Sequence, residues 1–524
     1  MKNKIYPFLS IFIASLLIFG CEVKKPHKSK VLNLNFAMEP ISLDPRFGTN
    51  VTSQSVIRAL FEGLMKVSDV GDVTCGIAES YSVSEDKKTY VFKLRDAHWS
   101  DGQAVSAYDF EYAWKSSILP NSKCRVPQLF HTIKNAEKIR KKLLPIGAMG
   151  VKAIDEKILQ VELEYPIPFF LNLLSNPVFS PLREDRDNFD RPSEIITNGP
   201  FIVKKYELGK RISLVKNSHY YSNAQIKING IEISFVKDPQ TSMYMFEKKE
   251  IDYIGSPISK IPFEEEEKLL KSGKLNIKPI AAIYWLGFNT SQFPYNNSHF
   301  RKALAYSLNN ELFSKALNYK KPAKSFVPVS LSNLSEKELI SWYNVNEAQK
   351  ELKIALSELN CSIEDLPPLK VTYGGQTSGG KTIALLIKRQ WEDNLKIKVA
   401  LEEMESNSYL AAIFNHKLDI AGTGWFAHFD DPLYHLETFK LRSYKSNWAV
   451  WENKDFVKIL DKSNQVPDPD KRKSILKEAE KIMKEDMPIV PLYYEDYRYL
   501  VKPNVHDIVI TKTGGIEFRY CHID

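Results

Sequence analysis

Short segments with the spacing of β-strands alternate with helical segments along most of this 524-residue chain. Residues 31–37 and 90–94 alternate apolar and polar side chains, whereas residues 53–65 and 300–317 repeat apolar side chains at helical intervals. At about 100 to 200 residues per domain, the length predicts two or three domains. No motif recurs at a fixed period, which excludes solenoids and propellers. The pattern therefore predicts a mixed α/β protein with several sheets.

Two local patterns are specific enough to predict individual elements. Ser106 and Asp109 have the spacing of a capping box and mark the start of a helix. Residues 370–373, 383–391 and 397–401 follow one another as strand, helix and strand, which is the order of a βαβ unit. Further strands are predicted at residues 201–204, 212–215 and 231–236, and a last amphipathic helix at residues 469–487.

The positive charge of the chain is concentrated at its beginning. Lys and Arg number 72 against 64 Asp and Glu, but from Val31 on the balance is 66 basic to 63 acidic residues. Nucleic-acid binding uses about one cationic contact per phosphate, and the body of the chain shows no basic stripe that would supply them. We therefore expect no nucleic-acid partner.

The first thirty residues have the features of an export signal. Residues 1–4 are cationic and residues 5–20 are apolar, a run too short to cross about 30 Å of hydrocarbon as a helix. Ile18-Phe19-Gly20-Cys21 resembles a bacterial lipoprotein signal, in which the cysteine thiol accepts a lipid. We expect cleavage after Gly20, a lipid on Cys21, a tether over residues 21–30 and an extracytoplasmic, membrane-anchored protein. The alternative is ordinary cleavage without a lipid.

The remaining cysteines, Cys75, Cys124, Cys361 and Cys521, are widely separated, without a Cys-x-x-Cys pair or a histidine cluster beside them. That spacing predicts neither a zinc site nor another cofactor. One or two disulfides remain open, because four cysteines allow three complete connectivities.

A series of motifs makes the chain similar to a known family. It resembles the peptide-binding extracytoplasmic solute receptors of ABC importers over almost all of its length after the signal. The motifs, in chain order, are Ser42-Leu43-Asp44-Pro45, Leu60-Phe61-Glu62-Gly63-Leu64, Trp99-Ser100-Asp101-Gly102, Thr197-Asn198-Gly199-Pro200-Phe201, Phe300-Arg301-Lys302-Ala303-Leu304, Gly424-Trp425, Asp431-Pro432 and Ile489-Val490-Pro491-Leu492-Tyr493.

The resemblance implies a bilobal α/β fold like that of periplasmic binding proteins, with a hinge and three domains built on mixed sheets. Lobe 1 would combine residues 31–70, 196–282 and 496–524 with an accessory domain at 71–195, and lobe 2 would comprise residues 283–495. The family encloses short peptides between the lobes and delivers them to permease subunits in the inner membrane. A monomeric binding protein without catalysis, cofactor or metal is therefore expected.

The same resemblance suggests where a peptide would be held. Peptides bound without regard to sequence are held by their main chain, through strand-like hydrogen bonds. Thr49, Asn50 and Val51 have the position of the family's loop that pairs with the peptide backbone. The facing strand corresponds to Thr423, Gly424 and Trp425, and Tyr284 is a further candidate for ligand contact.

One departure concerns the peptide's amino end. Three residues after the tryptophan, the oligopeptide-binding branch typically has an aspartate that pairs with the α-ammonium, and here that position is His428. An imidazole cannot replace a buried carboxylate. Either Asp430 or Asp431 supplies the countercharge, or the ligand lacks a free ammonium there. Lys381 is the candidate for the peptide's carboxyl end.

Other functions compete with peptide capture. Residues 375–382 fit the phosphate-loop pattern GxxxxGK[ST], which suggests an NTPase, but an exported chain meets no ATP and no magnesium-binding partner motif follows. His428 with Asp430 and Asp431 suggests a metal cluster, although adjacent acids after a strand more often cap a helix. A receptor of the same fold for a murein peptide, a nickel chelate or haem is the main alternative, and a surface adhesion protein is another.

Overall fold

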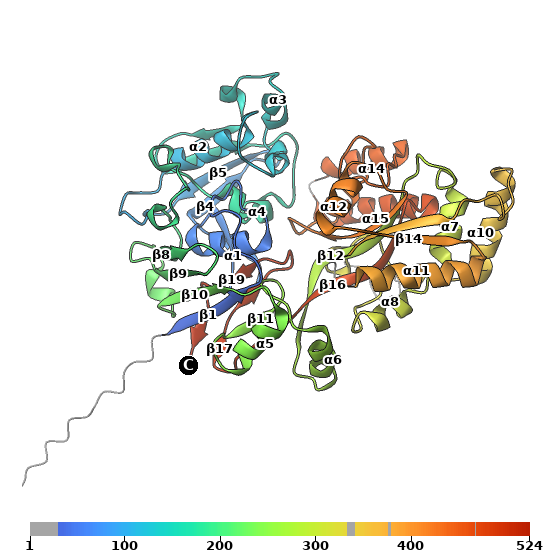
Figure 1. Cartoon of the computed structure of the whole chain (residues 1–524). Helices are drawn as coiled ribbons and strands as arrows, with labels where there is room; N and C mark the ends of the chain where they lie inside the picture. The colour runs from blue at the N-terminus through green and yellow to red at the C-terminus, as the bar shows by residue number, and fades with distance from the viewer. Residues whose placement is uncertain (1–29, 333–340, 376–378, 467) are drawn as a thin grey trace, which may run out of the picture.

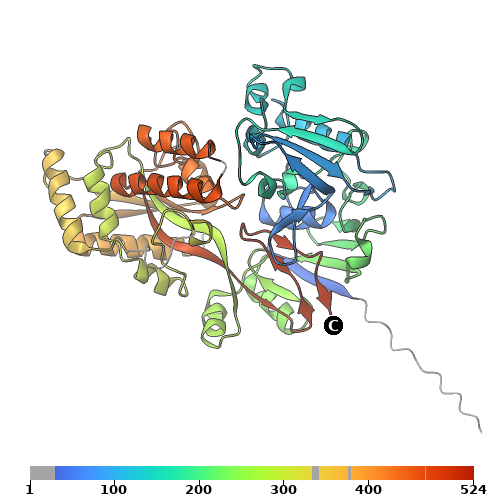
Figure 2. The ribbon, with the colours of Figure 1, turned by 180° about the vertical axis from the view of Figure 1, so that it is seen from behind.

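One ten-stranded mixed sheet runs through both lobes of the molecule. The computed structural model describes residues 30–332, 341–375, 379–466 and 468–524, so the predicted signal, Cys21 and the tether up to residue 29 lie outside the described residues. Figures 1 and 2 show two lobes joined by two long strands. The sheet order is β14 (Val399–Met404), β13 (Leu369–Gly374), β15 (Ile420–Phe426), β12 (Asn276–Phe288), β16 (Ile489–Val501), β11 (Tyr253–Gly255), β1 (Val31–Phe36), β10 (Gly230–Phe235), β9 (Arg211–Lys216) and β8 (Phe201–Glu207).

Strands β12 and β16 connect the lobes as an antiparallel ribbon. Their pairing is interrupted between Pro279 and Ile283. At this interruption the amide of Ala281 donates to the carbonyl of Lys512 at 2.6 Å, so a different segment replaces β16 as its partner. The predicted domain boundaries at 282/283 and 495/496 lie inside β12 and β16, respectively. Both boundaries are next to the interruption, where the pairing of the two strands is weakest and a hinge is therefore expected.

Lobe 1 carries a second, smaller sheet. Its four strands have the order β4 (Ala78–Val83), β5 (Thr89–Leu94), β7 (Ile158–Glu162) and β6 (Val151–Ala153). Helix α2 (Ala107–Ile118) packs on β6 and β7 and begins with the predicted capping box, in which the Ser106 amide donates to Asp109 Oδ2 at 2.8 Å. The remaining elements of lobe 1 are α1 (Val51–Leu60), β2 (Met65–Val67), β3 (Val73–Cys75), α3 (Ala136–Arg140), α4 (Phe170–Leu173), α5 (Pro239–Glu247) and α6 (Phe263–Lys271), with β17 (Val505–His506), β18 (Val509–Ile510), β19 (Ile516–Glu517) and β20 (His522–Ile523) in a C-terminal ribbon.

Lobe 2 contains the predicted βαβ unit. Strands β13 and β14 are parallel, and helix α11 (Gly380–Leu395) packs against both of them. The other helices are α7 (Ser298–Tyr306), α8 (Asn310–Ala316), α9 (Val329–Ser332), α10 (Val345–Glu358), α12 (Ser406–Phe414), α13 (Leu433–Glu437), α14 (Lys454–Asn464) and α15 (Pro469–Asp486). These elements and the sheet confirm the predicted mixed α/β fold class.

Two predicted helices have different bounds in the structure. The helix expected at residues 300–317 is divided into α7 and α8, because Asn309 caps a new helix with its side chain and donates its amide to Gln390 at 2.6 Å. Helix α1 ends before residue 65, because the amide of Gly199 binds the carbonyl of Leu60 at 2.8 Å. In both cases the helix ends at a contact with a group that is distant in sequence. Local periodicity cannot predict such a contact.

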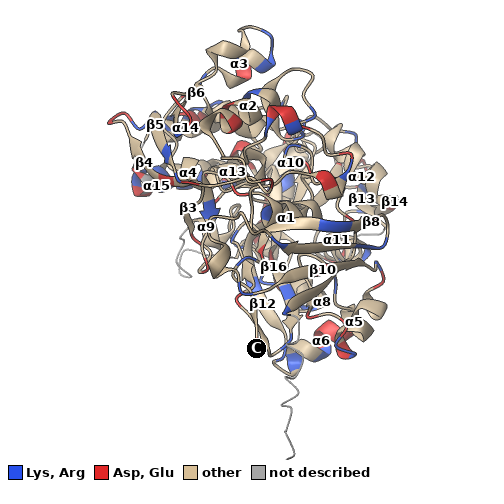
Figure 3. Ribbon diagram, turned by 90° about the vertical axis from the view of Figure 1, so that its left-hand side faces the viewer, with Lys and Arg blue, Asp and Glu red and all other residues tan. Residues whose placement is uncertain are grey.

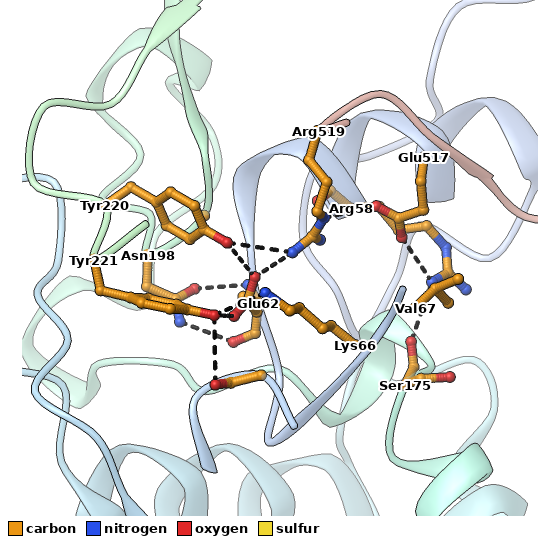
Figure 4. Close-up of polar contacts among 12 residues, drawn as sticks. Arg58, Glu62, Lys66, Val67, Ser175, Asn198, Tyr220, Tyr221, Glu517 and Arg519 are labelled. Carbon is orange, nitrogen blue, oxygen red and sulfur yellow. Dashed lines mark hydrogen bonds and ion pairs between the residues drawn. The ribbon is translucent and has the colours of Figure 1, made fainter. Parts of the chain in front are cut away.

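A buried polar network joins α1, the segment after it and the C-terminal ribbon (Figure 4). The Glu62 carboxylate pairs with Arg519 and accepts hydrogen bonds of 2.6 Å from each of the Tyr220 and Tyr221 hydroxyls. The Asn198 side chain binds both backbone groups of Glu62, at 3.1 and 2.8 Å. Two of the family motifs, residues 60–64 and 197–201, therefore meet in this network, which joins distant segments of lobe 1.

The charge distribution, the cysteines and the helix lengths bear on the expectations from the sequence. Figure 3 shows basic and acidic segments interspersed over the ribbon in that view. The cysteines that follow residue 29 are all free thiols. Among the helices of the described ranges, none has both the length and the apolar character to cross a membrane.

Replacing Glu62 by Gln should destabilise the protein strongly. Arg519 would keep only Glu517 as a counter-ion, which buried Arg58 also uses, and breaking a buried ion pair costs about 3 to 5 kcal/mol. We expect Glu62→Gln to lower the free energy of unfolding by about that amount in urea denaturation. Glu79→Gln is the matched control, because the Glu79–Lys93 pair at 2.8 Å is exposed and its loss should change stability little. Equal stabilities of the two variants would contradict the assigned role of Glu62.

Candidate functional site

Strand β15 has an open edge over its C-terminal half. β12 pairs with β15 from Ile420 to Phe426, whereas β13 pairs with it only at Ile420 and Ala421. From residue 422 on, the side of β15 that faces away from β12 has no strand partner among the described residues. An open strand edge is a site at which an extended chain can add as a further strand.

The hydrogen-bonding groups along this edge can be assigned from the register. The Gly422 amide donates to the Tyr409 hydroxyl at 2.9 Å and its carbonyl accepts from the same hydroxyl at 2.8 Å, so both groups point away from β12. Backbone groups alternate in direction along a strand. Those of Gly424 and Phe426 therefore also point outward, whereas those of Trp425 face β12. Of residues 423–425, for which main-chain contacts are predicted, only Gly424 has outward-facing backbone groups. Phe426 offers the next outward-facing groups along the strand.

Trp425 supports this edge from one face of the sheet. Its ring lies 6.5 Å from Trp285, 5.7 Å from Trp448 and 6.3 Å from Tyr434. His435 lies beneath, with its Nε2 at 3.4 Å from the Trp425 carbonyl, and burial lowers its pKa to about 3. Because the imidazole is neutral at any physiological pH, this wall is aromatic and uncharged.

Tyr284 lies on the opposite face. Its ring stacks on Tyr493 with centroids 5.1 Å apart, and a Cβ at Gly422 would come within 2.6 Å of its hydroxyl oxygen. Glycine at 422 is thus required by the tyrosine ring. This packing places Tyr284 beneath the open edge and leaves its ring half-buried, where it forms part of the floor next to Gly424.

On lobe 1, Thr49, Asn50 and Val51 lie at the start of α1, a helix that Figure 1 shows within that lobe. The Asn50 side chain caps α1 by accepting from the Ser53 amide at 3.2 Å, so it is occupied within the helix. Val51 is the first helical residue and its side chain is 38% exposed. This segment forms the N-terminus of a helix, and in the described chain it pairs with no strand.

An aromatic pair is one of the contacts between the lobes, beside polar contacts such as the ion pair of Lys512 with Asp430. Phe169, in the accessory domain, stacks on Phe429 of lobe 2 with ring centroids 4.2 Å apart and planes at 2°. Both rings are buried, at 7% and 8% exposure. The guanidinium of Arg472, a residue of α15, lies 5.4 Å from the centroid of the Phe169 ring. This contact closes the gap between the lobes a few residues beyond the open edge of β15.

The acidic residues near the edge differ in availability. Asp431 is buried, pairs with Arg472 and accepts from the Leu433 amide at 2.8 Å, so its carboxylate serves the local structure. Asp430 is more exposed and lies 3.2 Å from Lys512, a lysine of the C-terminal ribbon that is half exposed. Asp430 is therefore the carboxylate that a ligand could recruit, because its existing partner is solvated.

His428 and Glu495 complete the polar groups of the site. Burial lowers the pKa of the His428 imidazole, which packs edge-on against Tyr434 at 5.3 Å. Glu495 was missed by the sequence analysis: its Oε1 lies 3.8 Å from the position of a Cβ on Gly424, and its Oε2 pairs with Lys320 at 3.0 Å. Only its position two residues after the Ile489–Tyr493 motif could have indicated it.

The glycine-rich loop is an unfavourable phosphate cradle. Residues 376–378 lie outside the described residues, but a Cβ at Gly375 would come within 2.2 Å of the Glu403 carboxylate. An acid packed against the loop would repel a phosphate. Lys381 is exposed at the start of α11 and free to meet a carboxylate. No His428, Asp430 and Asp431 metal cluster is present in the described part of the chain, because Asp431 turns toward Arg472.

Two lobes joined by paired strands, with an open strand edge beside the gap, define the architecture of a periplasmic binding protein. The sequence profile named "Bacterial extracellular solute-binding proteins, family 5 Middle" matches residues 72–447. The chain belongs to this family of bacterial extracellular solute-binding proteins.

Individual relatives match over nearly the whole chain. The oligopeptide-binding protein OppA of Bacillus subtilis is 32% identical over 95% of this chain and 94% of its own. Among solved structures, the murein tripeptide binding protein MppA of Escherichia coli has a TM-score of 0.81 at 25% identity, covering 95% of this chain and 99% of the other. The oligopeptide-binding protein OppAIV of Borrelia burgdorferi has a TM-score of 0.80 at 26% identity, covering 95% and 100%.

Removing the interlobe ring pair should favour an open arrangement. Phe169→Ala deletes a stacked, buried ring, a contact worth about 0.5 to 1.5 kcal/mol beyond its buried area. We expect small-angle X-ray scattering of the peptide-free protein to give a larger radius of gyration for this variant. Phe263→Ala, which truncates a half-exposed ring on α6, is the control. Superimposable scattering curves for Phe169→Ala and the unaltered protein would show that the pair does not hold the lobes together.

Proposed function

We propose that this protein captures short peptides between its two lobes and delivers them to an ABC permease. The observation that carries the proposal is the open edge of β15, where Gly424 and Phe426 turn their backbone groups toward the gap. A peptide that adds to this edge is held by its amides, so its side chains are free to vary. Family membership and the relatives described above, two of which are named oligopeptide-binding proteins, support the same ligand class.

The ends of the peptide would be met by charges from the two sides of the site. Asp430 is our candidate for the ammonium, because Asp431 is already neutralised by Arg472. Glu495, beside Gly424, is the competing carboxylate. Lys381 is the candidate for the carboxyl end. Thr49, Asn50 and Val51 would close over the peptide from lobe 1, with the N-terminus of α1 directed at it.

Closure would couple capture to delivery. β12 and β16 are the only strands of the described chain that belong to both lobes, so bending at their interrupted pairing would move one lobe against the other. A peptide that contacts β15 on lobe 2 and α1 on lobe 1 stabilises the closed form by bridging them. The permease would then recognise the closed arrangement of the two lobes, and the binding protein would act as a monomer without catalysis.

The main-chain contact can be tested by one substitution and its matched control. Gly424→Pro removes the outward amide donor without touching the β12 ladder, whereas Gly424→Ala keeps that donor and adds one methyl group. A hydrogen bond contributes about 1 kcal/mol net, so Gly424→Pro should weaken binding of a random tetrapeptide pool by about tenfold in calorimetric titration. Gly424→Ala should bind nearly as the unaltered protein does. No heat of binding from any variant, the unaltered protein included, would overturn the proposed function.

The ammonium contact can be tested in the same titration with an N-acetylated pool. Acetylation should weaken binding to the unaltered protein, and Asp430→Asn should abolish that difference while Glu495→Gln retains it. If instead Glu495→Gln abolishes the difference and Asp430→Asn retains it, Glu495 binds the ammonium. Equal binding of free and acetylated pools by all three proteins would show that the ammonium is not recognised.

We also propose that Cys21 carries a lipid that holds the protein at the membrane, as its signal sequence predicts. Cys21→Ala should move the protein from the membrane fraction to the soluble extracytoplasmic fraction after cell lysis, because a lipid chain supplies about 0.8 kcal/mol of membrane affinity per buried CH₂. A Cys75→Ala variant is the control. Unchanged membrane association of Cys21→Ala would exclude this anchor.

A murein peptide is the second candidate ligand, favoured by the similarity to the murein tripeptide binding protein of E. coli. Titration with a murein tripeptide beside the tetrapeptide pool distinguishes the two. Tighter binding of the murein tripeptide would make it the ligand.

A further inference from the structure

Two histidines face each other on the C-terminal ribbon of lobe 1. β17 and β20 are antiparallel, and their register places His506 directly opposite His522. The two rings stack with centroids 4.7 Å apart and planes at 25°. This cluster could not be predicted from the spacing of the histidines, because strand pairing, and not proximity along the chain, brings the rings together.

A carboxylate completes a group of three. Asp524 follows His522 by two residues and therefore lies on the same face of the ribbon. Its amide is fixed by a 3.0 Å hydrogen bond to the carbonyl of Asn504. Its side chain reaches both rings, with Oδ2 at 2.8 Å from His506 Nε2 and Oδ1 at 3.9 Å from His522 Nε2. The three potential ligand atoms all lie within 4.8 Å of one another.

These separations match the needs of a small divalent cation. Zinc binds histidine nitrogen and carboxylate oxygen at about 2.0 to 2.2 Å, so tetrahedral ligand atoms lie roughly 3.3 Å apart. The distances of 2.8 and 3.9 Å, which end on different oxygens of Asp524, lie on either side of that value, and rotation of the exposed Asp524 side chain would bring one oxygen between the two rings. Two imidazoles and a carboxylate are ligands suited to zinc, copper and nickel, and not to calcium or magnesium.

A second carboxylate lies beside one of the rings, within ion-pair distance of a buried ring nitrogen that makes no hydrogen bond in the described chain. Asp507 has a left-handed backbone, with φ of 58°, and its Oδ2 lies 3.0 Å from His522 Nδ1. Metal-binding histidines are typically held by a carboxylate on the ring nitrogen that does not bind the metal. A proton on Nδ1, which faces Asp507, leaves the lone pair of His522 on Nε2, which faces Asp524. Such an outer carboxylate also supplies negative charge that favours a cation.

We propose that His506, His522 and Asp524 bind a zinc-class divalent cation, with Asp507 positioning His522 and water completing the coordination. The site lies on β17 and β20 at the end of lobe 1 marked by the C-terminus in Figure 1, while β15 belongs to the other lobe. A bound cation would cross-link the ends of the ribbon that carries Glu517 and Arg519, the partners of the buried network in Figure 4. Its role is stabilisation of lobe 1 and is independent of peptide binding.

The proposal can be tested by calorimetric titration of the full chain, purified without a polyhistidine tag, with zinc chloride and with magnesium chloride. We expect one zinc ion per chain, no binding of magnesium and a zinc-dependent rise in melting temperature. Absorption of the cobalt-substituted protein in the visible range should report tetrahedral coordination. Peptide titration should be the same with and without zinc.

Variants separate a built site from adventitious binding. His506→Ala combined with His522→Ala should abolish the one-to-one zinc isotherm and the thermal shift, and Asp507→Asn should weaken zinc affinity by about tenfold. His219→Ala removes an exposed histidine elsewhere on lobe 1 and should change nothing. The proposal is overturned if the unaltered protein shows no zinc binding, or if the double variant binds zinc as tightly as His219→Ala does.

Discussion

The pairing of β12 with β16 is the constraint on which the rest of the molecule depends. These two strands build the centre of the large sheet, join the lobes and position β15 beside the gap. Because β15 takes its register from β12, the direction in which Gly424 and Phe426 point is set by the strand that also carries the hinge. The ribbon in which the hinge is proposed therefore also orients the edge proposed to bind the ligand.

Buried polar contacts hold the elements around this ribbon in place. Glu62 and Arg519 tie the beginning of lobe 1 to its end, and Asp431 with Arg472 fixes the loop that follows β15. Such pairs contribute specificity more than net stability, since their desolvation offsets much of their attraction. Buried ion pairs therefore fix the ends of lobe 1 and the loop that follows β15, whereas Phe169 and Phe429 meet between the lobes through an uncharged ring contact.

Local pattern predicted most elements, and long-range contacts decided the remainder. β1, β5, the βαβ unit and the capping box of α2 follow from periodicity and spacing. The division of α7 from α8 depends on Gln390, and the end of α1 depends on Gly199, neither of which is adjacent in sequence. For the site, the resemblance indicated β15, but only the register shows that Gly424 and Phe426, and not Trp425, face outward. Glu495 and the paired His506 and His522 come together through strand pairing alone.

The hydroxyl of Tyr409 has a further consequence for any chain that lies along β15. By occupying both backbone groups of Gly422, it mimics one rung of the ladder and blocks the edge at that point. A chain that binds as proposed would pair from Gly424 onward, because the Tyr409 hydroxyl already occupies the hydrogen-bonding groups nearer to β13. The phenol would then set the same starting register for bound chains of any length.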